Sequence, residues 1–173
     1  GCVSIPVLIT GGIHIDGYMD TTDALRSYQP REKKLEILKD PHIGAFAVIG
    51  AIKVMLTYGI GLGLLTDYWN LNTAISYGLI FVISRCVCGI SSIVLPKAKK
   101  NGMLSEETKA RNKSGCIVLL VQLILALGVL LGIEPVKGLL VVAGLIVVTL
   151  YYVQITKKQF GGVTGDTAGY FVT

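Results

Sequence analysis

Four long, mainly apolar stretches limit what this chain of 173 residues can fold into. They run from His42 to Leu65, from Leu71 to Leu95, from Ser114 to Ile133 and from Lys137 to Ile155. A helix needs about 20 apolar residues to cross a hydrocarbon core of roughly 30 Å, and each stretch is about that long. Only 16% of the residues are charged, against roughly 25% in an average soluble domain. We therefore predict an all-α fold, a polytopic bundle of transmembrane helices that forms a single membrane domain.

The two ends of the chain carry shorter apolar segments. The chain begins with Gly1, and its opening GCVSIPVLITGGI is too short to cross a membrane alone. Another helix is predicted to begin near Asp166, close to the last residue. We therefore expect residues 1–173 to be part of a longer protein, with a partial helix at each end.

The basic residues predict how the spans are oriented. Most of the 16 Lys and Arg residues lie before the first stretch, between the second and third, or after the fourth. The other two loops, around Asp67 and Pro135, contain only Lys137, at a helix edge. Short loops rich in Lys and Arg stay in the cytoplasm, so we expect a protein of the cell (inner) membrane, surrounded by lipid. The segments HIDGYMDTTDAL (14–25) and FGGVTGDTAGY (160–170) are then predicted to emerge together on the cytoplasmic face, which makes that face the expected active site.

The first of these segments carries three aspartates at helical spacing. Asp16, Asp20 and Asp23 lie within roughly 60° of one another on a helix. Carboxylates so close repel one another unless a cation lies between them, and Mg²⁺ prefers oxygen ligands that it shares with water and phosphate. The alternative is a solvated acidic face, or carboxylates at a helix start. We favour a metal site, because unpaired charge beside membrane spans is costly.

The second segment is rich in glycine. Gly161, Gly162, Gly165 and Gly169 surround Thr164 and Asp166. Glycine lets backbone N–H groups approach an anion, and a helix starting at Asp166 would direct further N–H groups to the same point. Glycines at membrane interfaces also serve helix packing alone. Because both segments share a face, we predict that Asp166 is a fourth metal ligand and that the loop holds a pyrophosphate.

Other polar positions are less specific. His14 could orient a carboxylate or contact phosphate, or be structural. Arg85 and Lys53 lie deep within their spans, where a cation is functional or is paired with another buried group. Both could line a cavity open to the cytoplasm. From Pro30 a short amphipathic helix is predicted, which lies either at the membrane surface or in a solvated loop.

A carboxylate site for Mg²⁺ beside an anion-binding loop suits phosphoryl transfer from a diphosphate donor to an alcohol. The CDP-alcohol phosphotransferases are one such class, with a DG-xx-AR pattern. Asp16-Gly17 matches this pattern, but Asp20-Thr21 replaces AR, and Pro30, Lys34 and Leu38 replace the later Gly and Asp residues. An ion-coupled transporter is a second alternative, but it predicts inverted repeats, which the sequence does not show.

The motifs resemble instead those of the adenosylcobinamide-GDP ribazoletransferase family, also called cobalamin synthase. The matching stretches are GGIHIDGYMDTTDAL (11–25), REKKLEILKDPHIGAF (31–46), SR (84–85) with LPKAKKNGM (95–103), and FGGVTGDTAGY (160–170). They follow that family's order and spacing over nearly the whole chain.

This resemblance implies a Mg²⁺-dependent membrane enzyme of late cobalamin biosynthesis. Such an enzyme transfers cobinamide phosphate from adenosylcobinamide-GDP to α-ribazole or its 5′-phosphate and releases GMP. It implies that the metal and diphosphate are bound by Asp16, Asp20, Asp23 and Asp166. Asp16 and Asp23 would be catalytic, with Asp23 accepting the proton of the ribazole hydroxyl. Further substrate contacts are expected from His14, Lys39, Arg85, Gly161, Gly162 and Thr164. We expect no nucleic-acid partner, and the sequence leaves open whether the protein forms a homo-oligomer.

Overall fold

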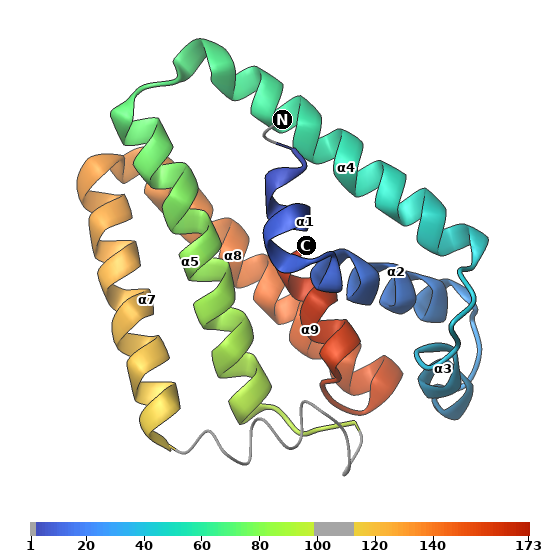
Figure 1. Cartoon of the computed structure of the whole chain (residues 1–173). Coiled ribbons are helices and arrows are strands. Elements are labelled where there is room, and N and C mark those ends of the chain that lie inside the picture. Colours follow the sequence, from blue (N-terminus) through green and yellow to red (C-terminus); the bar gives the residue numbers. More distant parts are fainter. Residues whose placement is uncertain (1–2, 99–112) are drawn as a thin grey trace.

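Four long helices form the apolar part of the molecule (Figure 1). They are α4 (Ala45–Leu65), α5 (Leu71–Val94), α7 (Lys113–Ile133) and α8 (Pro135–Ile155). A 3₁₀ turn, η1 (Thr66–Tyr68), follows α4, and a π-helical turn, η2 (Thr156–Phe160), follows α8. Each long helix can cross a membrane, with a mean hydropathy of 1.8 to 2.9. A long apolar helix is confirmed at each of the four predicted spans, although α4 begins only at Ala45, because Gly44 before it is extended.

This computed structural model describes residues 3–98 and 113–173. Regular structure within these two ranges is helical, apart from an isolated bridge between Lys97 and Val163. The prediction of an all-α fold is therefore confirmed. Most of the basic loop between the second and third spans, including the end of the LPKAKKNGM stretch, lies outside the described residues.

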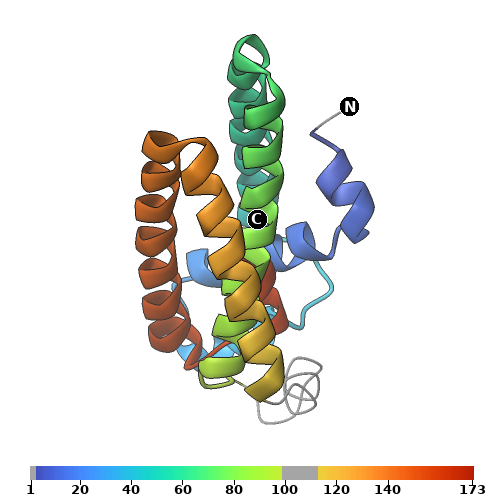
Figure 2. The same ribbon diagram turned by 90° about the vertical axis from the view of Figure 1, so that its left-hand side faces the viewer.

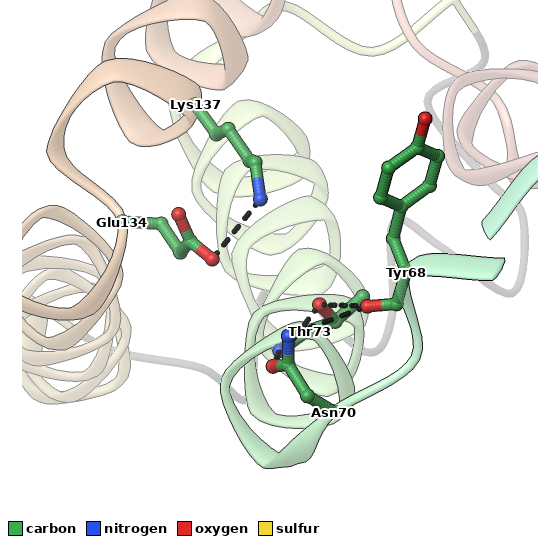
Figure 3. A network of polar contacts seen from close by, with 5 residues as sticks. All are labelled: Tyr68, Asn70, Thr73, Glu134 and Lys137. Carbon is green, nitrogen blue, oxygen red and sulfur yellow. Dashed lines mark hydrogen bonds and ion pairs between the residues drawn. The ribbon is translucent and has the colours of Figure 1, made fainter. Parts of the chain in front are cut away.

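The loops at one end of the long helices are fixed by short polar contacts (Figure 3). Asn70 caps α5, since the Thr73 N–H donates to its Oδ1 at 2.9 Å. The Thr73 hydroxyl also donates to the carbonyl of Tyr68 at 2.9 Å. At the start of α8, the ammonium of Lys137 lies 3.0 Å from a carboxylate oxygen of Glu134. Glu134 thus offsets the positive charge of Lys137, the one basic residue that the sequence places in these two loops. This end of the long helices therefore carries no net excess of Lys and Arg.

Short helices lie toward the opposite end of the long helices (Figure 2). They are α2 (Ile13–Arg26), α3 (Arg31–Ile37) and α9 (Gly165–Val172), and α1 (Ile5–Thr10) precedes them in the chain. Among the described elements, α2 and α9 form the most extensive contact, and α2 also contacts α4. The contact with α9 depends on Gly17, where a Cβ atom would lie 2.8 Å from the backbone oxygen of Asp166. The two predicted motifs therefore meet where α2 packs against α9.

Helix α3 covers the turn at the end of α8. Leu38, just after α3, forms a buried cluster with Ala24 of α2 and Phe160 of η2, and Leu35 packs against this cluster. The predicted short helix is confirmed, but its apolar face packs against protein. Phe160, which is distant in sequence, supplies the apolar surface for this packing. Whether the helix lies at the membrane surface or in a solvated loop stays a prediction.

Three of the long helices, α5, α7 and α8, share a small apolar core. Ile83 of α5 and Ala126 and Leu130 of α7 form a buried cluster, with side chains of α8 packed against it. Large apolar side chains on the other faces are exposed, including Leu140 at 69% and Ile124 at 66%. Such exposure is costly in water and favourable in lipid. The pattern fits a multi-pass membrane protein.

Candidate functional site

With α2 packed against α9, three of the four predicted carboxylates lie near the fourth, Asp20. Partial burial raises the pKa of Asp20 from its usual value to about 6, and repulsion from Asp16, Asp166 and Asp23 adds to the increase. Asp16, Asp23 and Asp166 therefore each lie within electrostatic range of Asp20. This is the grouping that the sequence predicted.

These carboxylates repel one another without enclosing a closed metal site. In the described part of the chain, no three acidic, histidine or cysteine side chains are close enough to hold a metal ion together. Within the same residues, no salt bridge reaches Asp16, Asp20 or Asp23. Hard oxygen donors with mutual repulsion suit a divalent cation that takes its other ligands from water and phosphate. The residues fit Mg²⁺ in this open form, and magnesium binding stays a prediction.

Asp23 lies at a different place from the other three carboxylates. A Cβ atom on Gly44 would collide with both carboxylate oxygens of Asp23, so this side chain lies directly over Gly44. Gly44 is the N-cap of α4, and the positive end of a helix dipole favours a negative charge there. For Asp23, this position supports the alternative to a metal ligand, a carboxylate that lies at the start of a helix. The role of Asp23 as proton acceptor stays a prediction.

His14 and Arg85 lie together, on the other side of α2. Two residues of helix turn the side chain by roughly 200°, so His14 and Asp16 point in nearly opposite directions. His14 and Arg85 line a cavity of about 100 Å³ between α1, α2, α4 and α5. Burial and the nearby Arg85 lower the pKa of His14. The Arg85 guanidinium lies 5.2 Å from the centre of the Phe81 ring and donates to the Ser84 hydroxyl at 3.2 Å.

These positions bear on three predicted roles. His14 does not face the aspartates, so the idea that it orients a carboxylate gains no support. Arg85 lines this cavity, and Lys53 lies in a separate hollow with the exposed Ile49, Ile52 and Leu56 of α4. That either hollow opens to the cytoplasm stays a prediction. Substrate contacts by His14 and Arg85 stay predictions.

The backbone N–H groups of the glycine-rich loop donate hydrogen bonds to carbonyl groups of the protein itself. Those of Gly161 and Gly162 donate to the carbonyls of Lys157 and Thr156, both at 3.1 Å. The N–H of Val163 donates to the carbonyl of Pro96 at 2.8 Å. These N–H groups are therefore not open to an anion in this conformation.

Thr164 is engaged as the N-cap of α9. Its N–H donates to the Thr167 hydroxyl at 2.9 Å, and its own hydroxyl accepts from the Thr167 N–H at 3.1 Å. The glycines before it serve the fold, since Gly161 has a φ of 74° and a Cβ on Gly162 would collide with the carbonyl of Pro96. Phosphate contacts by Gly161, Gly162 and Thr164 stay predictions, and they would need a rearrangement or side-chain donors.

Three basic residues that the sequence analysis did not select surround this loop. Arg31 donates from Nε to the carbonyl of Phe160 at 2.9 Å, and its guanidinium lies over Gly161. Lys34 is only 6% exposed and donates to the Gln159 side chain at 2.5 Å. Lys97 pairs with Val163 through its backbone. The spacing of Arg31 and Lys34 shows a shared helix face, but only the fold shows what that face contacts. Lys39, a predicted substrate contact, is exposed just after α3.

Comparison with known proteins identifies relatives of this chain. Residues 1–173 match the model of a protein family described as cobalamin-5-phosphate synthase. A protein named adenosylcobinamide-GDP ribazoletransferase from Lachnoclostridium phytofermentans is 41% identical over 98% of this chain and 64% of its own length. Proteins of the same name from Clostridium botulinum and Sinorhizobium medicae are 36% and 30% identical, each over 96% of this chain and 65% of the relative.

The chain thus spans slightly less than two thirds of the length of these relatives. No solved structure matches it. The whole-chain match favours the family that the motifs resemble over the CDP-alcohol phosphotransferase and transporter alternatives. The chain belongs to the cobalamin-5-phosphate synthase family.

Proposed function

We propose that the protein containing this chain transfers cobinamide phosphate from adenosylcobinamide-GDP to α-ribazole or α-ribazole 5′-phosphate, with release of GMP. The observation that carries the proposal is the contact of α2 with α9, which gathers Asp16, Asp20 and Asp166 beside Asp23. The name shared by the relatives supports the choice of donor and acceptor.

The reaction exchanges one phosphorus–oxygen bond for another. The ribazole hydroxyl oxygen forms a bond to the phosphorus that carries cobinamide, and the bond from this phosphorus to the bridging oxygen of GMP breaks. The electron pair leaves with GMP, and the hydroxyl proton passes to a carboxylate, for which Asp23 is the predicted acceptor. Asp16, Asp20 and Asp166 would hold Mg²⁺, which neutralises charge on the phosphate oxygens when bound.

The chain's own contribution is to hold these groups in place. Helix packing at Gly17 fixes Asp166 of α9 against the helix that carries Asp16 and Asp20. In phosphoryl transfer the protein acts mainly by positioning and by electrostatic stabilisation. A packed contact between two helices holds such a position more rigidly than a loop.

We further propose that this site faces the cytoplasm from the cell membrane. The support is the excess of basic residues at this end and the pairing of Lys137 with Glu134 at the other. Four helices of sufficient length and apolarity are consistent with a multi-pass protein.

The test is product formation by the full-length protein in lipid nanodiscs. Adenosylcobinamide-GDP and α-ribazole 5′-phosphate are supplied, and GMP and the cobalamin product are quantified with Mg²⁺ or with EDTA. We expect Mg²⁺-dependent product, at least ~100-fold less product with Asp16→Asn, and normal product with Asp67→Asn, which changes an exposed aspartate at the other end of α4. No product from folded wild-type protein, or full activity of Asp16→Asn, would overturn the proposal.

A further inference from the structure

Arg31, Lys34 and Lys97 form a group of cations, here called the basic collar, around residues 159–163. Arg31 and Lys34 reach this turn from α3, through Phe160 and Gln159. Lys97 reaches it from the segment after α5, where residues 96–98 run beside Gly162 and Val163. Segments far apart in the sequence thus bring three basic residues to one turn.

The basic collar has no acidic partner among the described residues. Among the residues that the structure describes, the buried Lys97 ammonium has no hydrogen-bond partner, and burial lowers its pKa. The buried Lys34 has a neutral partner, Gln159. Neighbouring Lys33, by contrast, is exposed and lies 2.8 Å from Glu36. Buried charges are normally paired, so Lys34 and Lys97, with the exposed Arg31 beside them, have the properties of an anion site.

The collar also lies next to the carboxylates. Phe160, which accepts from Arg31, packs against Ala24 of α2. Ala24 follows Asp20 by one helical turn, a rise of roughly 6 Å. Beyond the turn, the chain continues directly into α9 and Asp166. A diphosphate bound at the carboxylates through a metal can therefore extend its second phosphate toward the collar.

We propose that the basic collar binds the phosphate of the guanosine end of the donor, and therefore binds GMP when it is released. This inference rests on the proposed function. When the bond to the bridging oxygen breaks, the GMP phosphate takes the electron pair and gains a unit of negative charge. Cations placed there stabilise the leaving group more in the transition state than in the bound donor, which is the condition for faster transfer.

The test is GMP binding by the full-length protein in nanodiscs, measured by equilibrium dialysis with labelled GMP in EDTA. We expect Arg31→Gln and Lys97→Gln each to raise the Kd for GMP by about tenfold or more, as for loss of a charged hydrogen bond. Lys33→Gln, the matched control on α3, should change Kd by less than about twofold. Arg31→Lys should restore part of the affinity, because it keeps the charge but loses the planar fork.

A structural role for the collar predicts a different result. If Arg31 and Lys34 only tie α3 to the turn, Arg31→Gln lowers the melting temperature but leaves the Kd of the folded protein unchanged. That result, or wild-type protein that does not bind GMP, would overturn the inference. Because binding is measured without turnover, collar-dependent GMP binding by a protein that makes no cobalamin product would sustain the anion site while refuting the proposed reaction.

Discussion

Replacing Gly17 with alanine would place a methyl group against the backbone of α9. The new Cβ would lie 2.8 Å from the Asp166 oxygen and 3.0 Å from its Cα, whereas ordinary contacts begin near 3.4 Å. Backbone atoms cannot rotate away as a flexible side chain can, so α9 must move by several tenths of an ångström. Overpacking of this kind costs about 1–3 kcal/mol. It also displaces Asp166 from Asp16 and Asp20, and small misplacements of reacting groups lower rates by up to ~100-fold.

The assay combines thermal unfolding in nanodiscs with GMP release under saturating substrates. The control is Gly78→Ala in α5, where an added Cβ meets nothing within 4 Å. Helix propensity alone should make this control neutral or more stable by up to ~1 kcal/mol. We expect Gly17→Ala to lose stability and ~10- to 100-fold in kcat, with the control unchanged. Wild-type stability and kcat for Gly17→Ala would refute the claim that this close contact builds the site.

Three further predictions test other parts of the account. The pKa of Asp20 is raised to about 6, so without metal the folded state should lose stability as pH rises from about 4 to about 6. Asp20→Asn should abolish this loss and raise Tm at pH 7.5 in EDTA. Thermal unfolding measured across this pH range tests both expectations. Thr164→Ala removes the cap of α9 and should cost about 1 kcal/mol in thermal unfolding, whereas Thr164→Ser should cost less. In spheroplasts, a membrane-impermeant maleimide should label Asp67→Cys from outside but label Lys39→Cys only after lysis; the reverse would contradict the proposed orientation.

The sequence predicted the features that depend on length and periodicity. The spans follow from stretches such as Leu71–Leu95, which a bilayer requires to be helical. The even number of spans between the segments of Asp16 and Asp166 predicts that both segments lie at the same end of the long helices, as α2 and α9 do (Figure 2). The opposite directions of His14 and Asp16 also follow from helical periodicity, so this separation could have been predicted.

Features that depend on contacts distant in sequence could not be predicted. The spacing of Leu35 and Leu38 shows an amphipathic helix but not that Phe160 covers its apolar face. The sequence around Gly161 and Gly162 is the same whether their N–H groups bind a phosphate or backbone carbonyls. Only the fold shows that they bind carbonyls and that the segment from Pro96 runs alongside this loop. Asp23 likewise resembles the other aspartates until Gly44 is found beneath it.

The central claim is that carboxylates from α2 and α9 form one metal site. Mn²⁺ can replace Mg²⁺ as a paramagnetic probe, and its binding to the full-length protein in nanodiscs can be measured by electron paramagnetic resonance without any turnover. We predict that wild type and Asp67→Asn bind Mn²⁺ alike, and that Asp16→Asn, Asp20→Asn and Asp166→Asn each weaken binding by about tenfold or more. Undiminished binding in Asp20→Asn and Asp166→Asn would contradict the claim, because the metal would then lie elsewhere.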